Sequence, residues 1–356
     1  MISSIVRCRK MFLLGERDAR IALSLKECLD INREALISLT QGTGVVPSRL
    51  GLPYPDNPSM KDSKESSDAA TDWTLFKPAA YYSSSDEGDV QMGMKVVSVR
   101  ANNPNNGLPL VPATILLLDA KSGIVEATVG GTYITAARTS AGPALAVQTF
   151  QPGVEHLVLF GAGAQAECHI ELMEVALERK IPRITIINRT RERAEKLKTK
   201  LLVDRDISIE VLLLSDSNAI KDALLTADVV AATTNTTTPL WEDGSVLKKG
   251  CLITGIGSYT PNMQEIPESA VNSSHVIVDT AEAMEVGDLK HLGKFGSTTH
   301  PVTLAGDAFI SPHTVGRGMD YIFYKAVGTA IQDVLTARVV VERAKDLGMG
   351  EEVEMS

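Results

Sequence analysis

Apolar positions in the first part of the chain follow two different periods. From Glu16 to Leu39 they recur every three or four residues, which predicts an amphipathic helix. Later runs alternate or are rich in β-branched residues, as strands are, and these runs are Met94–Val99, Ala113–Leu118 and Ile124–Val129. Turn-forming residues at 119–123 join the last two runs as a hairpin. This part of the chain is therefore expected to form an antiparallel sheet.

After about Arg138 the pattern changes to short apolar strands separated by amphipathic helices such as Ala164–Glu178 and Arg191–Leu202. Strands that are apolar on both faces and alternate with helices form parallel sheets with right-handed crossovers. Six of them in this order predict a doubly wound, Rossmann-type nucleotide-binding domain. The expected strands are His156–Phe160, Arg183–Ile187, Ser208–Leu214, Asp228–Thr234, Cys251–Gly257 and His275–Thr280.

The end of the chain, Asp320–Leu347, reads as one long helical pattern without a strand, and we expect it to pack on the first domain. The fold class is therefore α/β, with two domains that are not successive halves. Residues 136–309 form the Rossmann domain, and residues 1–135 and 310–356 form a discontinuous α+β domain. Two domains also agree with a length of 356 residues.

Composition excludes several classes of partner. Lys and Arg total 35 and Asp and Glu total 44, so the net charge of −9 gives no reason to bind nucleic acid or an anionic membrane. No apolar run reaches the roughly 20 residues that span a bilayer. The four cysteines and six histidines lack paired spacings, so neither a disulfide framework nor a metal site is expected.

Two segments lie outside these patterns. The first ten residues are basic, and we interpret them as the start of a cytoplasmic protein rather than as a targeting segment. The stretch Pro53–Asp72 is rich in Pro, Ser and Asp and has no apolar period, which predicts a surface excursion inside the first domain.

The sharpest motif is the glycine loop that follows the strand ending at Phe160. Gly161 permits a tight turn, Gly163 lets the backbone approach a pyrophosphate, and the small Ala166 lets the next helix sit close to the strand. The N–H groups that open this helix favour phosphate. We therefore expect a dinucleotide to bind here, at Gly161, Gly163, Ala164, Gln165 and Ala166.

The choice of nicotinamide cofactor is read at the end of the second strand. An NAD enzyme usually has Asp or Glu there to hold the ribose 2′-hydroxyl, whereas this chain has Asn188, Arg189 and Thr190, followed by Arg193. A guanidinium group is suited to a 2′-phosphate. The residues favour NADP(H), and NAD(H) stays the alternative.

The chain resembles the ornithine cyclodeaminase/mu-crystallin family over nearly its whole length. The resemblance is carried by Gly93–Ala146, by the GAGAQA loop and by Gly316–Val334. The N-terminal extension and the Ser/Asp-rich insertion around 56–72 depart from the family but lie outside these motifs. The resemblance implies that the discontinuous domain binds substrate and forms a homodimer. It also implies an α-imino or α-amino carboxylate substrate beside a nicotinamide.

Site residues follow from the resemblance one at a time. Arg49 and Arg138 match family arginines that hold the substrate carboxylate, and a planar guanidinium suits that task. Lys95 matches a lysine that contacts the substrate and acts in proton transfer. Thr139 is placed near the cofactor phosphates, and Glu285 matches a glutamate near the imine.

One position departs from the cyclodeaminase pattern. Tyr259 stands where cyclodeaminases carry an Asp, and a phenol cannot replace a carboxylate base near neutral pH. The resemblance is therefore closer to the reductase branch, and we expect reduction of a small, cyclic imino carboxylate to the amino acid, or its reverse. Ornithine cyclodeaminase, which converts ornithine to proline and ammonia, and a mu-crystallin-like protein that binds NADPH and a small ligand stay open as alternatives.

Overall fold

The computed structural model describes residues 9–54, 72–83, 90–203 and 206–355, and these residues form two compact units. The first unit takes in the chain up to Ile31, Gln41–Thr135 and the end of the chain from Thr329; the second takes in Asn32–Thr40 and Ala136–Gly328. Most of the basic N-terminal segment and of the Ser/Asp-rich excursion lies outside the described residues.

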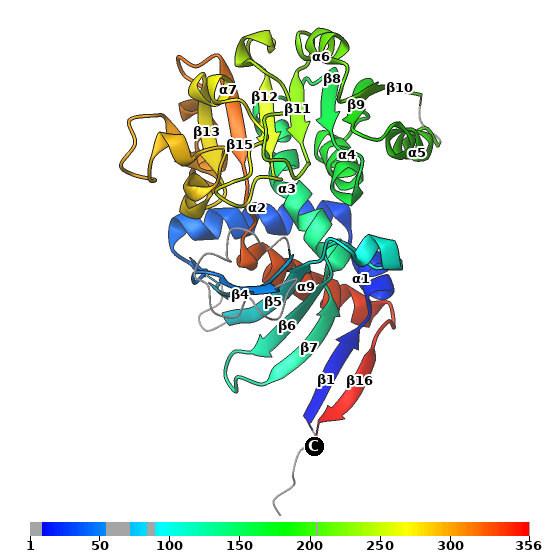
Figure 1. Cartoon of the computed structure of the whole chain (residues 1–356). Coiled ribbons are helices and arrows are strands. Elements are labelled where there is room, and N and C mark those ends of the chain that lie inside the picture. Colours follow the sequence, from blue (N-terminus) through cyan, green and yellow to red (C-terminus); the bar gives the residue numbers. More distant parts are fainter. Residues whose placement is uncertain (1–8, 55–71, 84–89, 204–205, 356) are drawn as a thin grey trace, which may run out of the picture. The chain divides into compact units, whose positions relative to one another are not determined.

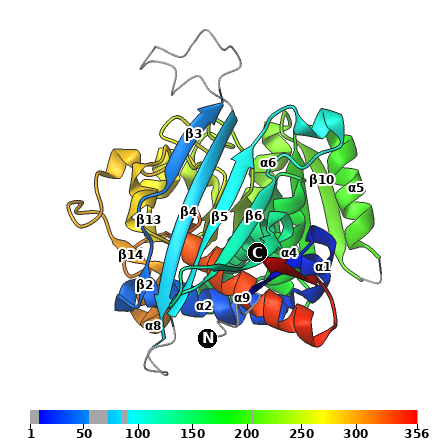
Figure 2. The same cartoon turned by 90° about the horizontal axis from the view of Figure 1, so that it is seen from below.

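The first unit is built on a mostly antiparallel sheet with the strand order β16-β1-β7-β6-β5-β4-β2, and β3 also pairs with β4 (Figure 1 and Figure 2). The predicted hairpin is confirmed by the antiparallel pairing of β6 with β7. Helix α9 (Ala330–Asp346) packs on β4, β5 and β6. The strands are β1 (Arg9–Leu14), β2 (Gly44–Val45), β3 (Leu50–Tyr54), β4 (Asp72–Tyr82), β5 (Val90–Val99), β6 (Ala113–Asp119), β7 (Val125–Gly130) and β16 (Glu351–Met355).

The helix expected from Glu16 to Leu39 is broken in two. Helix α1 (Glu16–Ala22) ends at Leu23, whose backbone is extended, and α2 (Leu25–Gln41) begins two residues later. The Ser24 hydroxyl accepts a hydrogen bond from the N–H of Glu27, as a residue preceding a helix often does. The apolar period continues through the break and therefore hides it.

The second unit contains a parallel sheet with the order β10-β9-β8-β11-β12-β15-β13-β14 (Figure 1), which confirms the α/β class and the doubly wound order. Its strands are β8 (His156–Phe160), β9 (Arg183–Asn188), β10 (Ser208–Leu213), β11 (Val229–Ala232), β12 (Leu252–Gly255), β13 (Ser274–Val278), β14 (Val302–Leu304) and β15 (Tyr321–Lys325). Its helices include α3 (Thr132–Phe150), α4 (Ala164–Leu177), α5 (Arg191–Leu201), α6 (Ser217–Leu224), α7 (Glu268–Asn272) and α8 (Ala305–Ile310).

Strand β15 corrects the expectation that the chain is purely helical after Asp320. It lies between β12 and β13 and pairs with both in parallel. A short apolar run can form either a buried strand or a buried helix, and periodicity does not separate them. The boundary between the units consequently falls after Gly328 rather than at residue 310.

The carboxyl ends of the central strands meet at one edge of the second sheet. The pairing places Phe160 opposite Ala232, Ala232 opposite Gly255, and Gly255 opposite Lys325. Every residue of β8, β11, β12 and β13 is buried. Ligands of open α/β sheets bind outside this carboxyl edge, where the strand order reverses. In this sheet the reversal lies between β8 and β11.

Candidate active site

The glycine loop joins β8 to α4 at the carboxyl edge. Gly161 has a φ of +110°, and a Cβ placed there would lie 2.6 Å from Thr233 Oγ1, so only glycine fits. A Cβ on Gly163 would meet nothing within 4 Å, which leaves its backbone open to approach by a ligand. Gly163 is also the N-cap of α4, and because it has no side chain it does not cap the N–H groups that open this helix.

The first turn of α4 offers its N–H groups to an anion. Helix geometry leaves these N–H groups without partners inside the helix, and the helix dipole adds positive potential. Ala166 is fully buried, as the close packing of the helix on the sheet requires. The Gln165 side chain accepts a bond from Ser140 at 3.4 Å. These residues therefore fit the pyrophosphate of a dinucleotide.

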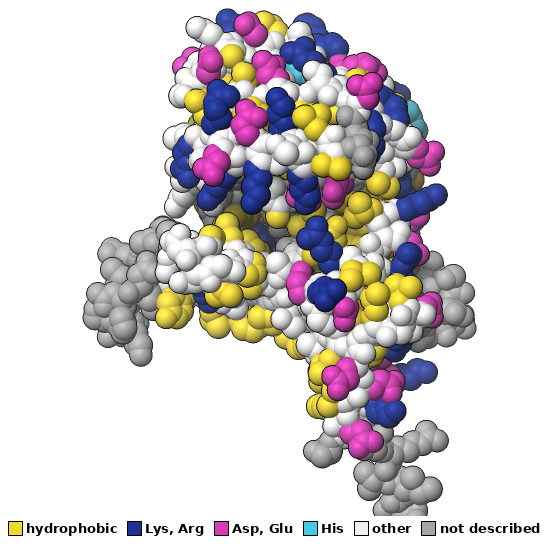
Figure 3. Space-filling view, turned by 90° about the vertical axis from the view of Figure 1, so that its right-hand side faces the viewer, with side chains coloured by type: hydrophobic (Ala, Val, Ile, Leu, Met, Phe, Trp, Pro, Cys, Tyr) yellow, Lys and Arg dark blue, Asp and Glu magenta, His cyan; other side chains and the backbone are white. Residues whose placement is uncertain are grey.

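The end of β9 presents arginines to solvent. Asn188 closes the turn by donating to the carbonyl of Thr190 at 2.8 Å, and Arg189, Thr190 and Arg193 are exposed. Figure 3 looks at this side of the second unit and shows Lys and Arg side chains among acidic ones. Both arginines are thus accessible to a charged ligand.

The first unit holds Lys95 in the interior. Lys95 on β5 is fully buried, and its Nζ donates to Asp333 Oδ1 of α9 at 2.6 Å and to Thr135 Oγ1 at 3.3 Å. Asp333 is fully buried as well. A buried ammonium is costly without such partners. The structure therefore gives Lys95 a fixed position and a balancing charge.

Two residues of this region are missing from the sequence predictions. Asp333 falls on the same helical face as the apolar Ala330 and Ala337, which is the signal that could have found it. Lys77 on β4 lies directly opposite Lys95 and is 5% exposed. A lysine in an otherwise apolar strand is the corresponding signal.

The predicted arginines lie in different units. Arg49 is half-buried in the link between β2 and β3 of the first unit, whereas Arg138 and Thr139 lie on α3 in the second. Arg138 is 4% exposed, and a Cβ on Gly328, whose φ is +77°, would clash with its guanidinium. Asp279 fixes Gly328 by accepting from its N–H at 2.6 Å. That Arg49 and Arg138 together bind a substrate carboxylate stays a prediction.

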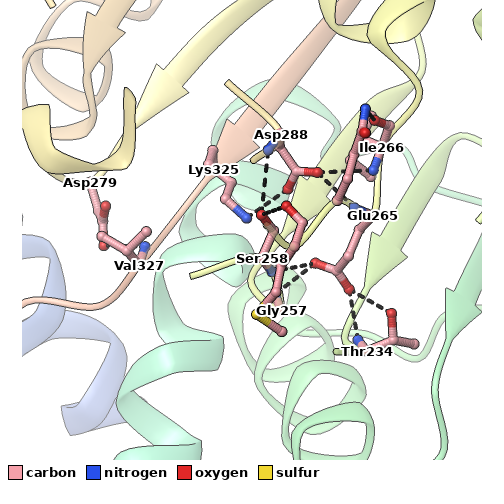
Figure 4. A network of polar contacts seen from close by, with 11 residues as sticks. Thr234, Gly257, Ser258, Glu265, Ile266, Asp279, Asp288, Lys325 and Val327 are labelled. Carbon is pink, nitrogen blue, oxygen red and sulfur yellow. Dashed lines mark hydrogen bonds and ion pairs between the residues drawn. The ribbon is translucent and has the colours of Figure 1, made fainter. Parts of the chain in front are cut away.

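Tyr259 lies in the loop that follows β12. The carboxylate of Glu265 closes this loop, because it accepts from the N–H groups of Gly257 at 2.6 Å and Ser258 at 3.1 Å (Figure 4). Burial raises the pKa of the Tyr259 phenol above its ordinary value, so it is still less able to act as a base near neutral pH.

Glu285 lies at the end of a 3-10 turn, Ala281–Glu285, and its side chain is exposed. The fully buried acid of this segment is Asp288, which bonds Lys325 at 2.8 Å. The role of Glu285 near the imine stays a prediction. Among the described residues no group of three or more His, Cys, Asp or Glu could hold a metal ion. No described helix is both long and apolar enough to cross a membrane.

Comparison with known proteins agrees with this architecture. The sequence profile of the ornithine cyclodeaminase/mu-crystallin family matches residues 80–348, and the chain belongs to this family. An uncharacterized cyclodeaminase of Dictyostelium discoideum is 30% identical, with 97% of this chain and 100% of the relative aligned. A Delta(1)-pyrroline-2-carboxylate reductase of Bacillus cereus is 28% identical with the same coverage, and the ketimine reductase mu-crystallin of Rattus norvegicus is 30% identical over 70% of this chain and 74% of its own.

Solved structures share the fold at lower identity. The Thermococcus litoralis Delta(1)-pyrroline-2-carboxylate reductase in complex with NADH and L-proline has a TM-score of 0.80 at 24% identity, over 96% of this chain and 100% of that one. An archaeal alanine dehydrogenase dimer with bound NAD has a TM-score of 0.81 at 22% identity, over 98% and 100%. These likenesses extend over both units.

His169 on α4 gives the second unit a pH-dependent stability. Burial lowers the pKa of its imidazole to about 4, and its Nδ1 bonds the carbonyl of Gln165 at 2.7 Å. The unfolded chain takes up a proton near pH 6.5 that the folded chain refuses, so stability is lost as the pH falls from about 6.5 towards 4. At pH 5.5 the loss is about 1.4 kcal/mol relative to pH 7.5.

The control variant is His169→Asn, whose amide nitrogen can replace Nδ1 but does not titrate. Urea unfolding at both pH values should show wild type losing about 1.4 kcal/mol more than the variant. If wild type and the variant lost equal stability, the pKa of His169 would not be lowered by folding.

Proposed function

We propose that the protein is an NAD(P)-dependent oxidoreductase that reduces the C=N bond of a small imino carboxylate to the amino acid, or catalyses the reverse oxidation. The observation that carries this proposal is the glycine loop, which is shaped for a dinucleotide: Gly163 is open to a ligand and α4 begins directly behind it. The reductases among the aligned relatives support the same reaction class.

The proposed roles of the site residues follow from their charges. The nicotinamide would supply or accept the hydride. Arg49 and Arg138 would bind the substrate carboxylate, because guanidinium forks match its two oxygens. Lys95 would add a third cation whose position Asp333 already fixes, and it would pass a proton to the imine nitrogen. Held in this way, the C=N bond has a high effective concentration at the nicotinamide. A homodimer, which the family resemblance implies, stays a prediction.

Cyclodeamination is the second candidate, because the Dictyostelium relative carries that name. Tyr259 argues against it, since burial raises the pKa of this phenol and leaves less phenolate to act as a base near neutral pH than in free tyrosine. The third candidate is a protein that binds the cofactor and a small ligand without turnover. An assay has to distinguish it from the two enzymes.

One assay separates these functions. The protein is incubated with NADPH and cyclic imino carboxylates, namely pyrroline-2-carboxylate, piperideine-2-carboxylate and sulfur-containing ketimines, while absorbance at about 340 nm is followed. We expect absorbance to fall with at least one of them. Ammonia released from ornithine without net cofactor consumption would identify a cyclodeaminase, and tight NADPH binding without any turnover would identify a binding protein.

Lys95 supplies the internal control for this assay. Lys95→Met should reduce turnover at least a hundredfold, the usual contribution of a proton-transferring group, and leave NADPH affinity nearly unchanged. Because this substitution removes the ion pair between Lys95 and the buried Asp333, Lys95→Met/Asp333→Asn is the matched variant, which regains stability but not turnover. Undiminished turnover in either variant would refute the role of Lys95.

We further propose that NADP(H) is preferred over NAD(H), with Arg189 and Arg193 binding the 2′-phosphate. Each lost charge-assisted bond costs roughly 1.5 kcal/mol, so Arg189→Gln/Arg193→Gln should raise the KM for NADPH about tenfold or more and hardly change that for NADH. Arg183→Gln is the matched control, since Arg183 is exposed at the opposite end of the same strand. A lower KM for NADH in wild type would contradict the proposal.

A further inference from the structure

Glu265 is held by four hydrogen-bond donors, an arrangement that favours a carboxylate. Its Oε1 accepts from the N–H and the hydroxyl of Thr234, both at 2.8 Å, and its Oε2 accepts from the N–H groups of Gly257 and Ser258 (Figure 4). Each oxygen thus takes two donors, and three of the four are backbone N–H groups, which can only donate. The side chain is fully buried.

Asp288 and Lys325 complete a buried network behind this carboxylate. Asp288 Oδ1 accepts from the N–H groups of Glu265 at 2.7 Å and of Ile266 at 3.1 Å, and Oδ2 accepts from Lys325 Nζ at 2.8 Å. Asp288 and Lys325 are both fully buried. Two carboxylates and one ammonium give the network a net charge of −1.

Two opposing influences act on Glu265. Burial and, to a smaller extent, the charge of Asp288 raise the pKa of its carboxyl group, and Lys325 and the bonds from Thr234 lower it. The three backbone N–H donors favour the ionised form, because a proton on Oε2 would have to break a bond from Gly257 or Ser258. Glu265 is therefore a fixed anion inside the second unit.

The network lies at the carboxyl edge of the parallel sheet. The strand order reverses between β8 and β11, and the network lies on the β11 side of this point. Thr234 follows β11, and Gly257 and Ser258 follow β12. A dinucleotide with its pyrophosphate at the glycine loop extends its adenosine half over β8 and β9 and its nicotinamide half over β11 and β12. The fixed anion would consequently lie on the side of the nicotinamide half.

We infer that Glu265, Asp288 and Lys325 set the redox preference of the bound nicotinamide by stabilising the positively charged, oxidised ring over the neutral, reduced ring. The inference rests on the proposed function, because it requires the glycine loop to bind a nicotinamide dinucleotide. Glu265 acts as a positioning and electrostatic residue: its charge lies behind the backbone of Thr234 and Gly257. Positive charge that develops on the ring in the direction of imine reduction is stabilised in the same way.

The ratio of two dissociation constants tests this electrostatic role. Kd is measured by titration for the oxidised and for the reduced cofactor, in wild type and in Glu265→Gln. A unit charge about 10 Å away at an effective dielectric constant near 20 changes binding by roughly tenfold. We expect Kd(oxidised)/Kd(reduced) to rise about tenfold in the variant. Glu174→Gln is the matched control, a buried glutamate at the far end of α4, and should leave the ratio unchanged.

A purely structural role predicts a different result. If Glu265 only orders the loop, both constants rise by the same factor and the ratio stays constant, which overturns the inference. Should Glu265→Gln not fold, Asp288→Asn replaces it, because its amide oxygen can keep both backbone bonds while one negative charge is lost. The same rise in the ratio is then expected. Failure of wild type to bind either cofactor would instead refute the proposed function.

Discussion

The cost of burying charge organises both units of this protein. In the second unit β8, β11, β12 and β13 bury every residue, so polar groups that face a ligand can stand only where the strands end. Parallel strands end together, and the loops after β8, β11 and β12 therefore share one edge. The glycine loop and the bonds to Glu265 both follow from this arrangement.

The described residues of each unit include a fully buried lysine–aspartate pair. Lys95 and Asp333 form it in the first unit, and Lys325 and Asp288 form it in the second. Such pairs add little net stability, because desolvation offsets most of their attraction, but removing one partner is expensive. Their value lies in fixing charges: one pair holds a candidate substrate-binding cation, and the other balances part of the negative charge of Glu265 and Asp288 at the carboxyl edge.

Much of the fold could be predicted from the sequence because its signals are local. The switch from alternating to helix-separated apolar runs predicted both sheets, and the glycine motif predicted the tight turn between β8 and α4. Strand β15 was missed because a short, mostly apolar run followed by a helix has no period of its own. The break between α1 and α2 was missed because the apolar face continues across it.

The buried polar contacts were harder to predict. Lys95 was identified through its motif, but Asp333 lies 238 positions further along the chain, and nothing in a single sequence pairs them. Glu265 and Asp288 stand among other acids of similar local context, and only folding shows which acids are buried. Glu285 was predicted in the site, and the buried acid nearby is Asp288.

Transfer of hydride to the α-carbon of an imino carboxylate is the central claim, and isotopic labelling tests it most directly. The protein is supplied with NAD(P)H carrying deuterium at both C4 positions and with the cyclic imino carboxylate that is turned over. Mass spectrometry and NMR of the product should show one deuterium, located on the α-carbon. A product without deuterium at the α-carbon would contradict hydride transfer to the C=N bond.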